Sequence, residues 1–139
     1  MNWLAWSFLS AVFAALTAVL AKIGVTGVNS NLATAIRTTV ILLFTWAIAA
    51  FSANLRDLGG LNRRTWVFLV LSGMATGLSW LCYFHALQVG EASRVAPIDK
   101  LSLALTLVLA AVFLKEVITW KLGLGVALMV AGALLTLSP

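Results

Sequence analysis

The stretch Trp3–Ile23, WLAWSFLSAVFAALTAVLAKI, decides the fold class of this chain. It holds a single charged residue, Lys22, which lies next to its end. A helix needs about 20 apolar residues to cross the hydrocarbon core of a bilayer, so this stretch predicts a membrane span. The apolar run is too long, and lacks the basic leading segment, for a cleaved signal peptide. We therefore expect it to be the first membrane span.

Four further stretches repeat this pattern. The apolar segments cover residues 3–23, 32–52, 65–87, 94–114 and 119–137. The connectors between them are short and contain turn residues such as Gly59-Gly60 and Gly90. The sequence predicts an all-α integral membrane protein, a bundle of five transmembrane helices that forms one domain over residues 1–139. No connector can hold a folded domain, so we expect the function within the membrane or at its faces.

Composition leads to the same class. The 139 residues are 63% hydrophobic and 9% charged, with a mean hydropathy of +1.08. A soluble domain carries roughly a quarter of charged residues, so most of this surface must face lipid. The single cysteine, Cys82, excludes an internal disulfide and a zinc set. No nucleophile–base set, phosphate loop, metal-spaced cluster or nucleic-acid-binding patch is found. We expect no catalytic residue, no metal and no cofactor.

The distribution of basic residues gives only a weak orientation signal. Five lie on the predicted N-terminal face, namely Arg56, Arg63, Arg64, Lys115 and Lys121. The opposite face has Lys22 and Arg94, and Arg37 and Lys100 lie deeper on that side. Loop residues alone place the N-terminus inside, whereas the full count is nearly balanced. A chain with so small a bias could insert in both orientations.

Ionisable residues within the spans gather toward one face. A charged side chain at the bilayer centre costs at least about 2.5–3.5 kcal/mol, so it normally faces an interior or a cavity. Arg37 lies about two turns into the second span, and Asp99 and Lys100 lie at a similar depth in the fourth. Lys22 and His85 lie near the corresponding ends of the first and third spans. Together they predict a polar layer in one half of the bilayer.

Asp99 and Lys100 are expected to have partners on other helices. Neighbours on a helix point about 100° apart and do not simply neutralise each other. We expect Asp99 to pair with Arg37, and Ser102 and Thr106 to extend a polar stripe from Asp99 at spacings of three and seven. Structural ion pairs are the alternative, but the depth of Arg37, Asp99 and Lys100 favours a functional cavity.

The basic residues at the span ends, the proline of the fourth span and the histidine each have two possible interpretations. Lys22 and Arg94 are expected to extend toward the lipid headgroups, rather than to serve the cavity. Pro97 removes one helix hydrogen bond and can loosen the preceding turn, or it only marks a helix start. His85 could carry protons, although an interfacial hydrogen-bonding role is preferred.

Deep aromatic and small residues complete the set. Trp80 lies too deep for the interface, and Tyr83 is one turn beyond it; both could line a pocket or simply pack. Gly73 and Gly77 form a GxxxG pair, which lets helices approach closely in a bundle or dimer. The candidate substrate-binding or coupling residues are therefore Arg37, Trp80, Tyr83, His85, Asp99, Lys100 and Ser102.

Family motifs begin at Tyr83 with YFHALQVGEASRVAPIDKLS, followed by LAAVFLKE up to Glu116. These segments closely resemble the second half of an EamA domain, the repeat of the drug/metabolite transporter superfamily. In that pattern A-L…A-S-x-V-A-P-[IL] leads into the fourth span and L-x-E closes it. The matching residues are Ala86-Leu87, Ala92-Ser93, Val95-Ala96-Pro97-Ile98 and Leu114-Lys115-Glu116. The earlier segments FAALT and AIRT look like the short, single-repeat members. Leu103 stands where larger members have a second proline, and the Asp99-Lys100 pair is not a general feature.

The resemblance implies a half-transporter. Ten-span members contain two inverted repeats around a cavity, so two copies or two related chains must associate. We expect a multi-pass protein of the cell inner (plasma) membrane that exports small metabolites by alternating access as an antiparallel homodimer. Toward this face, four cationic groups against two acidic ones predict an anionic or zwitterionic solute, such as an amino acid derivative; the groups are Lys22, Arg37, Arg94 and Lys100 against Glu91 and Asp99. The first span lacks the acidic residue of the small multidrug resistance relatives, so a cationic drug is disfavoured. A flippase subunit for a lipid-linked sugar and a non-transporting partner of another half-transporter are the alternatives.

Overall fold

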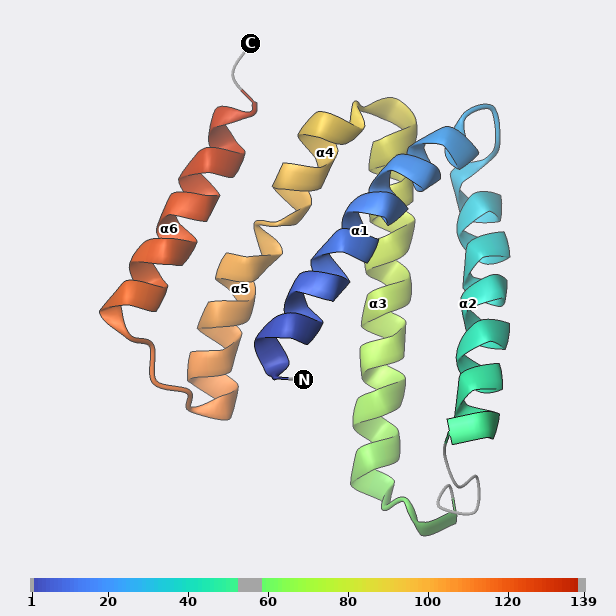
Figure 1. The fold of residues 1–139 in the computed structure, drawn as a ribbon, viewed down its shortest axis with the longest axis horizontal. Helices are drawn as coiled ribbons and strands as arrows, with labels where there is room; N and C mark the ends of the chain where they lie inside the picture. The colour runs from blue at the N-terminus through green and yellow to red at the C-terminus, as the bar shows by residue number, and fades with distance from the viewer. Residues whose placement is uncertain (1, 53–58, 138–139) are drawn as a thin grey trace. The chain divides into compact units, whose positions relative to one another are not determined.

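The computed structural model describes residues 2–52 and 59–137, and every regular element among them is a helix (Figure 1). The chain divides into two compact units, an N-terminal unit of residues 1–89 and a C-terminal unit of residues 90–139. The N-terminal unit contains α1 (Trp3–Val25), α2 (Ser30–Ser52) and α3 (Arg63–Val89). The C-terminal unit contains α4 (Ala92–Asp99), α5 (Ser102–Leu109), the π-helix η2 (Ala110–Leu114) and α6 (Trp120–Leu135).

Four of the predicted spans have the length and composition to cross a membrane. They are Trp3–Val25, Ser30–Ser52, Arg63–Val89 and the run Ala92–Leu114 formed by α4, α5 and η2. Their ends lie within two residues of the predicted limits. The fifth helix, α6, is apolar but has only 16 residues, which is shorter than the about 20 that a bilayer core requires. The structure thus confirms the all-helical class and is consistent with a helical membrane protein, with four helical segments long enough to span, and the fifth span stays a prediction. Arg56, which entered the orientation argument, lies outside the described residues.

Side-chain caps explain where several helices begin. The side chains of Asn2, Asn29, Asn62 and Thr119 each accept a hydrogen bond from a backbone N–H two or three residues later, at 2.7–3.3 Å. Asparagine and threonine satisfy N–H groups that the first helical turn leaves without a partner. In the apolar environment of a membrane such groups are costly to leave unpaired.

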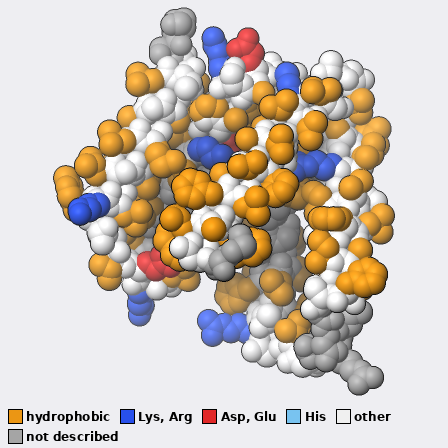
Figure 2. Space-filling model, in the orientation of Figure 1, with side chains coloured by type: hydrophobic (Ala, Val, Ile, Leu, Met, Phe, Trp, Pro, Cys, Tyr) orange, Lys and Arg blue, Asp and Glu red, His pale blue; other side chains and the backbone are white. Residues whose placement is uncertain are grey.

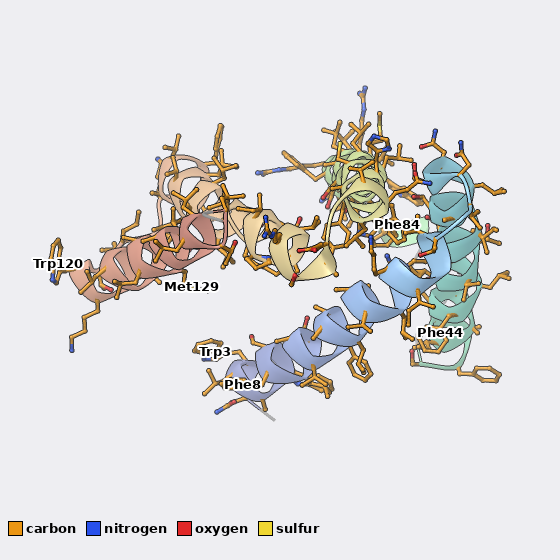
Figure 3. All side chains as sticks on the ribbon, turned by 90° about the horizontal axis from the view of Figure 1, so that it is seen from above. Trp3, Phe8, Phe44, Phe84, Trp120 and Met129 are labelled. Carbon is orange, nitrogen blue, oxygen red and sulfur yellow. The ribbon has the colours of Figure 1, made fainter. Side chains whose placement is uncertain are left out.

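The N-terminal unit is packed around one end of its three helices. The buried side chains there are Ala18, Val25, Ser30, Thr34, Phe84 and Leu87. They come from the end of α1, the start of α2 and the end of α3, and we call this cluster the hub. Phe84 and Leu87 are only 2% and 0% exposed. Figure 3 shows the Phe84 side chain directed from α3 toward the other two helices of its unit.

The C-terminal unit has an interrupted fourth span. Lys100 and Leu101 form a turn between α4 and α5, where the backbone bonds run from residue i to i−3. The span then ends in η2, after which Lys115 adopts a left-handed conformation with φ 56°. The Glu116 N–H bonds back to the Ala110 carbonyl at 3.3 Å and closes this end. Ala133 is the one buried residue described in this unit.

Most other apolar side chains are exposed. The view in Figure 2 shows hydrophobic groups over most of the helical surface and few charged ones. Trp3, Trp6, Trp66 and Trp120 lie at helix starts and are 48–82% exposed. Indole rings favour the membrane–water interface, so these positions are suited to the ends of membrane spans. Such a surface fits lipid as its solvent.

Candidate functional site

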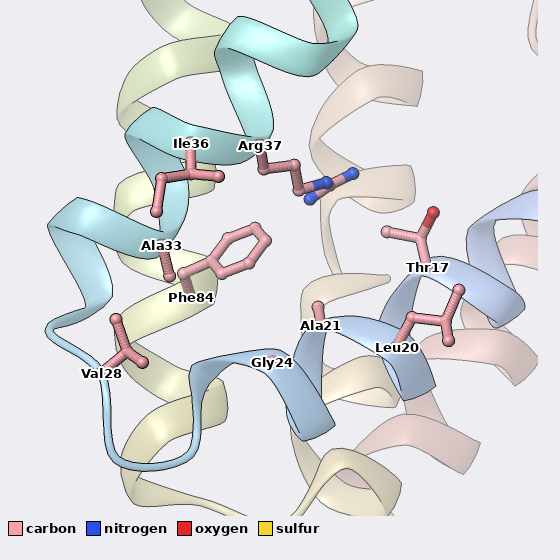
Figure 4. Close-up of a pocket in the computed structure, with 9 residues that line it drawn as sticks. All are labelled: Thr17, Leu20, Ala21, Gly24, Val28, Ala33, Ile36, Arg37 and Phe84. Carbon is pink, nitrogen blue, oxygen red and sulfur yellow. The ribbon is translucent and has the colours of Figure 1, made fainter.

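A pocket of about 360 Å³ lies in the N-terminal unit, beside the hub. The three helices and the α1–α2 turn contribute its lining residues, which are Thr17, Leu20, Ala21, Gly24, Val28, Ala33, Ile36, Arg37 and Phe84 (Figure 4). Its wall is apolar except at two points, the Thr17 hydroxyl and the Arg37 guanidinium. Figure 4 shows Arg37 extending from α2 into the space whose other side carries Thr17 and Leu20.

Aromatic rings hold the Arg37 guanidinium. Its Cζ atom lies 4.9 Å from the ring centre of Trp80 and 5.0 Å from that of Phe84. Trp80 and Phe84 are four residues apart on α3 and therefore occupy the same helix face. Tyr83 packs edge-on against Phe84, with the ring centres 6.2 Å apart. Cation–π contacts of this kind stabilise a cation without neutralising its charge.

Two hydrogen bonds join the helix ends beneath the pocket. Lys22 Nζ donates to the Leu87 carbonyl at 2.6 Å, and Gln88 Nε2 donates to the Val28 carbonyl at 2.8 Å. Lys22 therefore has a partner near the end of α3, and its extension toward the headgroups stays a prediction. The last carbonyls of a helix lack partners within it and carry partial negative charge, so an ammonium nearby is better placed there.

Charges in the C-terminal unit are paired locally. Lys100 Nζ lies 3.2 Å from Asp99 Oδ2, and Arg94 Nε lies 3.3 Å from Glu91 Oε2. The expectation that the neighbours Asp99 and Lys100 do not pair is wrong, because the helix is interrupted at Lys100 and the long lysine side chain can reach back. Arg94 is exposed at this site, as the headgroup interpretation requires.

The effect of Pro97 also differs from the prediction. The helix continues through Pro97 from Ala92 to Asp99, and the irregular turn follows the proline instead of preceding it. Because α5 starts anew at Ser102, the stripe expected from Asp99 through Ser102 to Thr106 does not follow one continuous helix. Ser102 is exposed.

The structure brings together three of the seven candidate residues. Arg37, Trp80 and Tyr83 belong to one cluster, whereas His85 is exposed and does not line the pocket. Asp99, Lys100 and Ser102 belong to the other unit, so the pair between Arg37 and Asp99 stays a prediction. The sequence analysis missed Phe84 and Thr17. The four-residue spacing of Phe84 from Trp80 was a usable signal for the first, and a hydroxyl inside an apolar span was one for the second.

The GxxxG pair has no close neighbour in this chain. A Cβ atom added at Gly73 or at Gly77 would meet no atom of the described residues within 4 Å. The prediction of a tightly packed helix contact at these positions is not fulfilled within the described chain.

The electrostatic balance of the N-terminal unit is one-sided. It contains five basic residues and one acidic residue, Asp57, which lies outside the described segments. Asp57 follows the end of α2 that is remote from Arg37. Within the described part of this unit no carboxylate faces Arg37. The described residues also contain no group of histidine, cysteine and carboxylate side chains able to hold a metal ion. The arrangement is suited to binding an anion.

Long apolar helices and a pocket lined by three of them are typical of a helical membrane protein. The chain belongs to the EamA-like transporter family, whose model matches residues 1–138. It is 52% identical over 134 residues to a Sinorhizobium sp. protein described as an uncharacterized transporter in the cobO 3' region, which covers 96% of this chain and 95% of the relative. A second relative, an uncharacterized protein of Methanocaldococcus jannaschii, is 28% identical over 53% of this chain and 54% of its own length. No solved structure matches the chain. The predicted family is confirmed, and the protein is a multi-pass membrane transporter.

Proposed function

We propose that this chain is half of a transporter that exports small anionic or zwitterionic metabolites, such as amino acid derivatives, across the cell inner membrane. The observation that carries the proposal is the Arg37 guanidinium, held by Trp80 and Phe84 in a pocket whose unit offers it no described carboxylate. A cation kept without a counter-ion in a membrane segment is costly, which argues for an anion that enters and leaves.

The remaining candidates are assigned supporting roles. Trp80 and Tyr83 are proposed to orient the Arg37 side chain, since both belong to the aromatic group around it. Asp99, Lys100 and Ser102 lie where the fourth span is interrupted, and broken helices are common where transporters bind solutes or ions. His85 is proposed as a proton-coupling group because an imidazole side chain can both accept and donate a proton.

The dimer part of the proposal rests on the repeat. One EamA-type domain over residues 1–139 is similar to half of a ten-span member, and the basic residues give little preference for one orientation. An antiparallel pair would supply the second, inverted half, as alternating access requires. The open faces at Gly73 and Gly77 are available to such a partner, since small residues permit close helix contacts.

The test is transport by the purified chain in liposomes, with labelled free and N-acetylated amino acids as probes. Arg37→Ala and Asp99→Asn should each reduce uptake strongly, since an ionic contact contributes about 1.5–3 kcal/mol. Unchanged transport by both variants would show that the proposed residues do not form the site. Reporter fusions at each terminus test the dimer: two orientations support the antiparallel homodimer, and one fixed orientation contradicts it.

One alternative is favoured by a specific observation. Arg94 is exposed near the start of α4, where it could bind the phosphate of a lipid-linked sugar that the protein flips. Uptake of a soluble solute into sealed vesicles would count against the flippase. A non-transporting partner of another half-transporter is the remaining alternative, and purification of the chain as a monomer alone would favour it.

A further inference from the structure

The shape of the Arg37 pocket restricts what it can hold. Its volume of about 360 Å³ is near the lower end for small-molecule sites. Leu20, Val28, Ile36 and Phe84 supply most of its wall, and Arg37 is the one charged side chain that lines it. The site therefore has one point of attachment for charge and a compact apolar remainder.

The guanidinium is oriented rather than neutralised. Its Cζ atom lies over the rings of Trp80 and Phe84, at 4.9 and 5.0 Å from their centres, and neither ring supplies a negative charge. The five N–H donors lie in the plane and point away from the faces. No described residue of the N-terminal unit accepts a hydrogen bond from them. A planar carboxylate is the group that fits two such donors at once.

We propose that this pocket binds an amphipathic monocarboxylate, with the carboxylate on Arg37 and a single aliphatic chain or aromatic ring against the apolar wall. This inference rests on the proposed function and narrows it from anionic or zwitterionic solutes to anionic ones. A second charge, either an ammonium or another carboxylate, would lie against the apolar side chains of Leu20, Val28 or Ile36 with no described counter-ion, which is unfavourable. The Thr17 hydroxyl is the only other polar side chain of the lining, and it can hydrogen-bond a neutral oxygen on the solute.

Because the wall is apolar, the affinity of a carboxylate should increase with the length of its aliphatic chain. Each buried methylene strengthens binding about fourfold. Hexanoate should therefore bind at least about tenfold more tightly than acetate, even if only half of its extra methylenes are buried. Phenylacetate should bind like hexanoate. Adipate, which adds a second carboxylate, and hexylamine, which reverses the charge, should bind at least about tenfold more weakly than hexanoate.

Calorimetric titration of the full chain in nanodiscs of phosphatidylcholine measures these affinities. Arg37→Gln should weaken phenylacetate binding by about 10- to 100-fold, because a hydrogen-bonded charge is lost. Arg37→Lys keeps the charge without the planar fork of donors. Its affinity for phenylacetate should lie between those of the unmodified chain and of Arg37→Gln. Ala21→Phe fills the pocket and should weaken phenylacetate binding more than acetate binding.

Arg64→Gln is the matched control. The Arg64 Cζ atom also lies over an aromatic ring, that of Phe68 at 5.8 Å, but at the opposite end of α3 and away from the pocket. This variant should bind phenylacetate like the unmodified chain. Each variant must show the elution profile and melting temperature of the unmodified chain before its affinity is compared.

Three results would overturn the assignment. One is equal affinity for acetate, adipate and phenylacetate; another is unchanged phenylacetate binding in both Arg37→Gln and Ala21→Phe. The third concerns lipid, which also combines an anion with an apolar body. If phosphatidylglycerol in the nanodiscs displaces phenylacetate in an Arg37-dependent manner and no carboxylate binds better than it, the pocket is a lipid site.

The same samples separate this inference from the proposed function. Arg37-dependent phenylacetate binding without uptake of any labelled solute into liposomes supports the pocket and contradicts transport by this chain. Uptake of an amino acid derivative without phenylacetate binding supports transport and contradicts the pocket assignment.

Discussion

The two units of the chain treat charge in opposite ways. The N-terminal unit has five basic residues and one acidic residue, and its Arg37 is surrounded by aromatic rings beside a packed hub. The C-terminal unit has four basic and three acidic residues, and two of its basic side chains pair with carboxylates one and three positions away in the sequence.

This difference separates an arginine with no described counter-ion from charges that are paired within the chain. A paired, exposed charge has its counter-ion already and contributes little to stability. An arginine held by rings keeps its attraction for an anion from outside. The contrast also holds for packing, since six described side chains are buried in the N-terminal unit and one in the C-terminal unit.

The largest effect is expected at the hub. Phe84→Ala removes a side chain that is 2% exposed, and it should lower the free energy of unfolding by about 3–5 kcal/mol. Phe113→Ala is the matched control in the C-terminal unit, where the side chain is 75% exposed, and should change it by less than about 0.5 kcal/mol. Unfolding by dodecyl sulfate in mixed micelles measures both. Similar losses for the two variants would remove the distinction between the units.

A smaller effect is expected at the hydrogen bond between α1 and the end of α3. Lys22→Met keeps the apolar stem but leaves the Leu87 carbonyl without the ammonium that lies 2.6 Å away. The free energy of unfolding should fall by about 1–3 kcal/mol. The same micelle assay measures this change. A change below about 0.5 kcal/mol would instead favour the interpretation that Lys22 extends toward the lipid headgroups.

The paired charges of the C-terminal unit should contribute less. Arg94→Gln and Glu91→Gln each break one ion pair whose side chains are 56% and 74% exposed. Each loss, and the coupling between them in a double-mutant cycle, should be between about 0.2 and 1 kcal/mol, and it should shrink in high salt. A coupling above about 2 kcal/mol would mean that this unit depends on its ion pairs.

The smallest change is expected at the end of η2. Lys115 has φ 56°, a conformation that costs a residue with a Cβ about 1–2 kcal/mol. Lys115→Gly removes that cost, although glycine loses more conformational freedom on folding. The net gain in unfolding free energy should be about 0.5 kcal/mol, seen as a slightly higher melting temperature. A clear loss would show that the lysine side chain has a contact of its own here.

Much of the fold could be predicted because a membrane span is determined by the composition of its own consecutive residues. The limits of α2 and α3 were placed within two residues, since a run of apolar side chains is read from neighbouring positions. The interruption at Lys100 was not predicted. One of the two interpretations of Pro97 loosened the turn before it, whereas the irregular turn follows it, because the place where a helix is interrupted depends on the surrounding packing as well as on the proline.

The candidate site was predicted in part for a similar reason. Arg37 was identified because an arginine inside a span is costly wherever it lies. Its partners could not be derived, because Trp80 and Phe84 are more than 40 residues away and aromatic residues in a span usually only pack. The local ion pair of Asp99 with Lys100 was missed because ideal helix geometry was assumed where the helix is interrupted.

The sequence by itself therefore determined the membrane class, the family and the presence of a costly cation in the second span. These properties follow from composition and spacing, which each segment carries alone. Only the tertiary structure decided that the cation would be oriented by two rings of α3 and would border an apolar pocket. That outcome depends on which faces of α1, α2 and α3 pack together at the hub. The packing energy arises between helices and cannot be derived from any one segment alone.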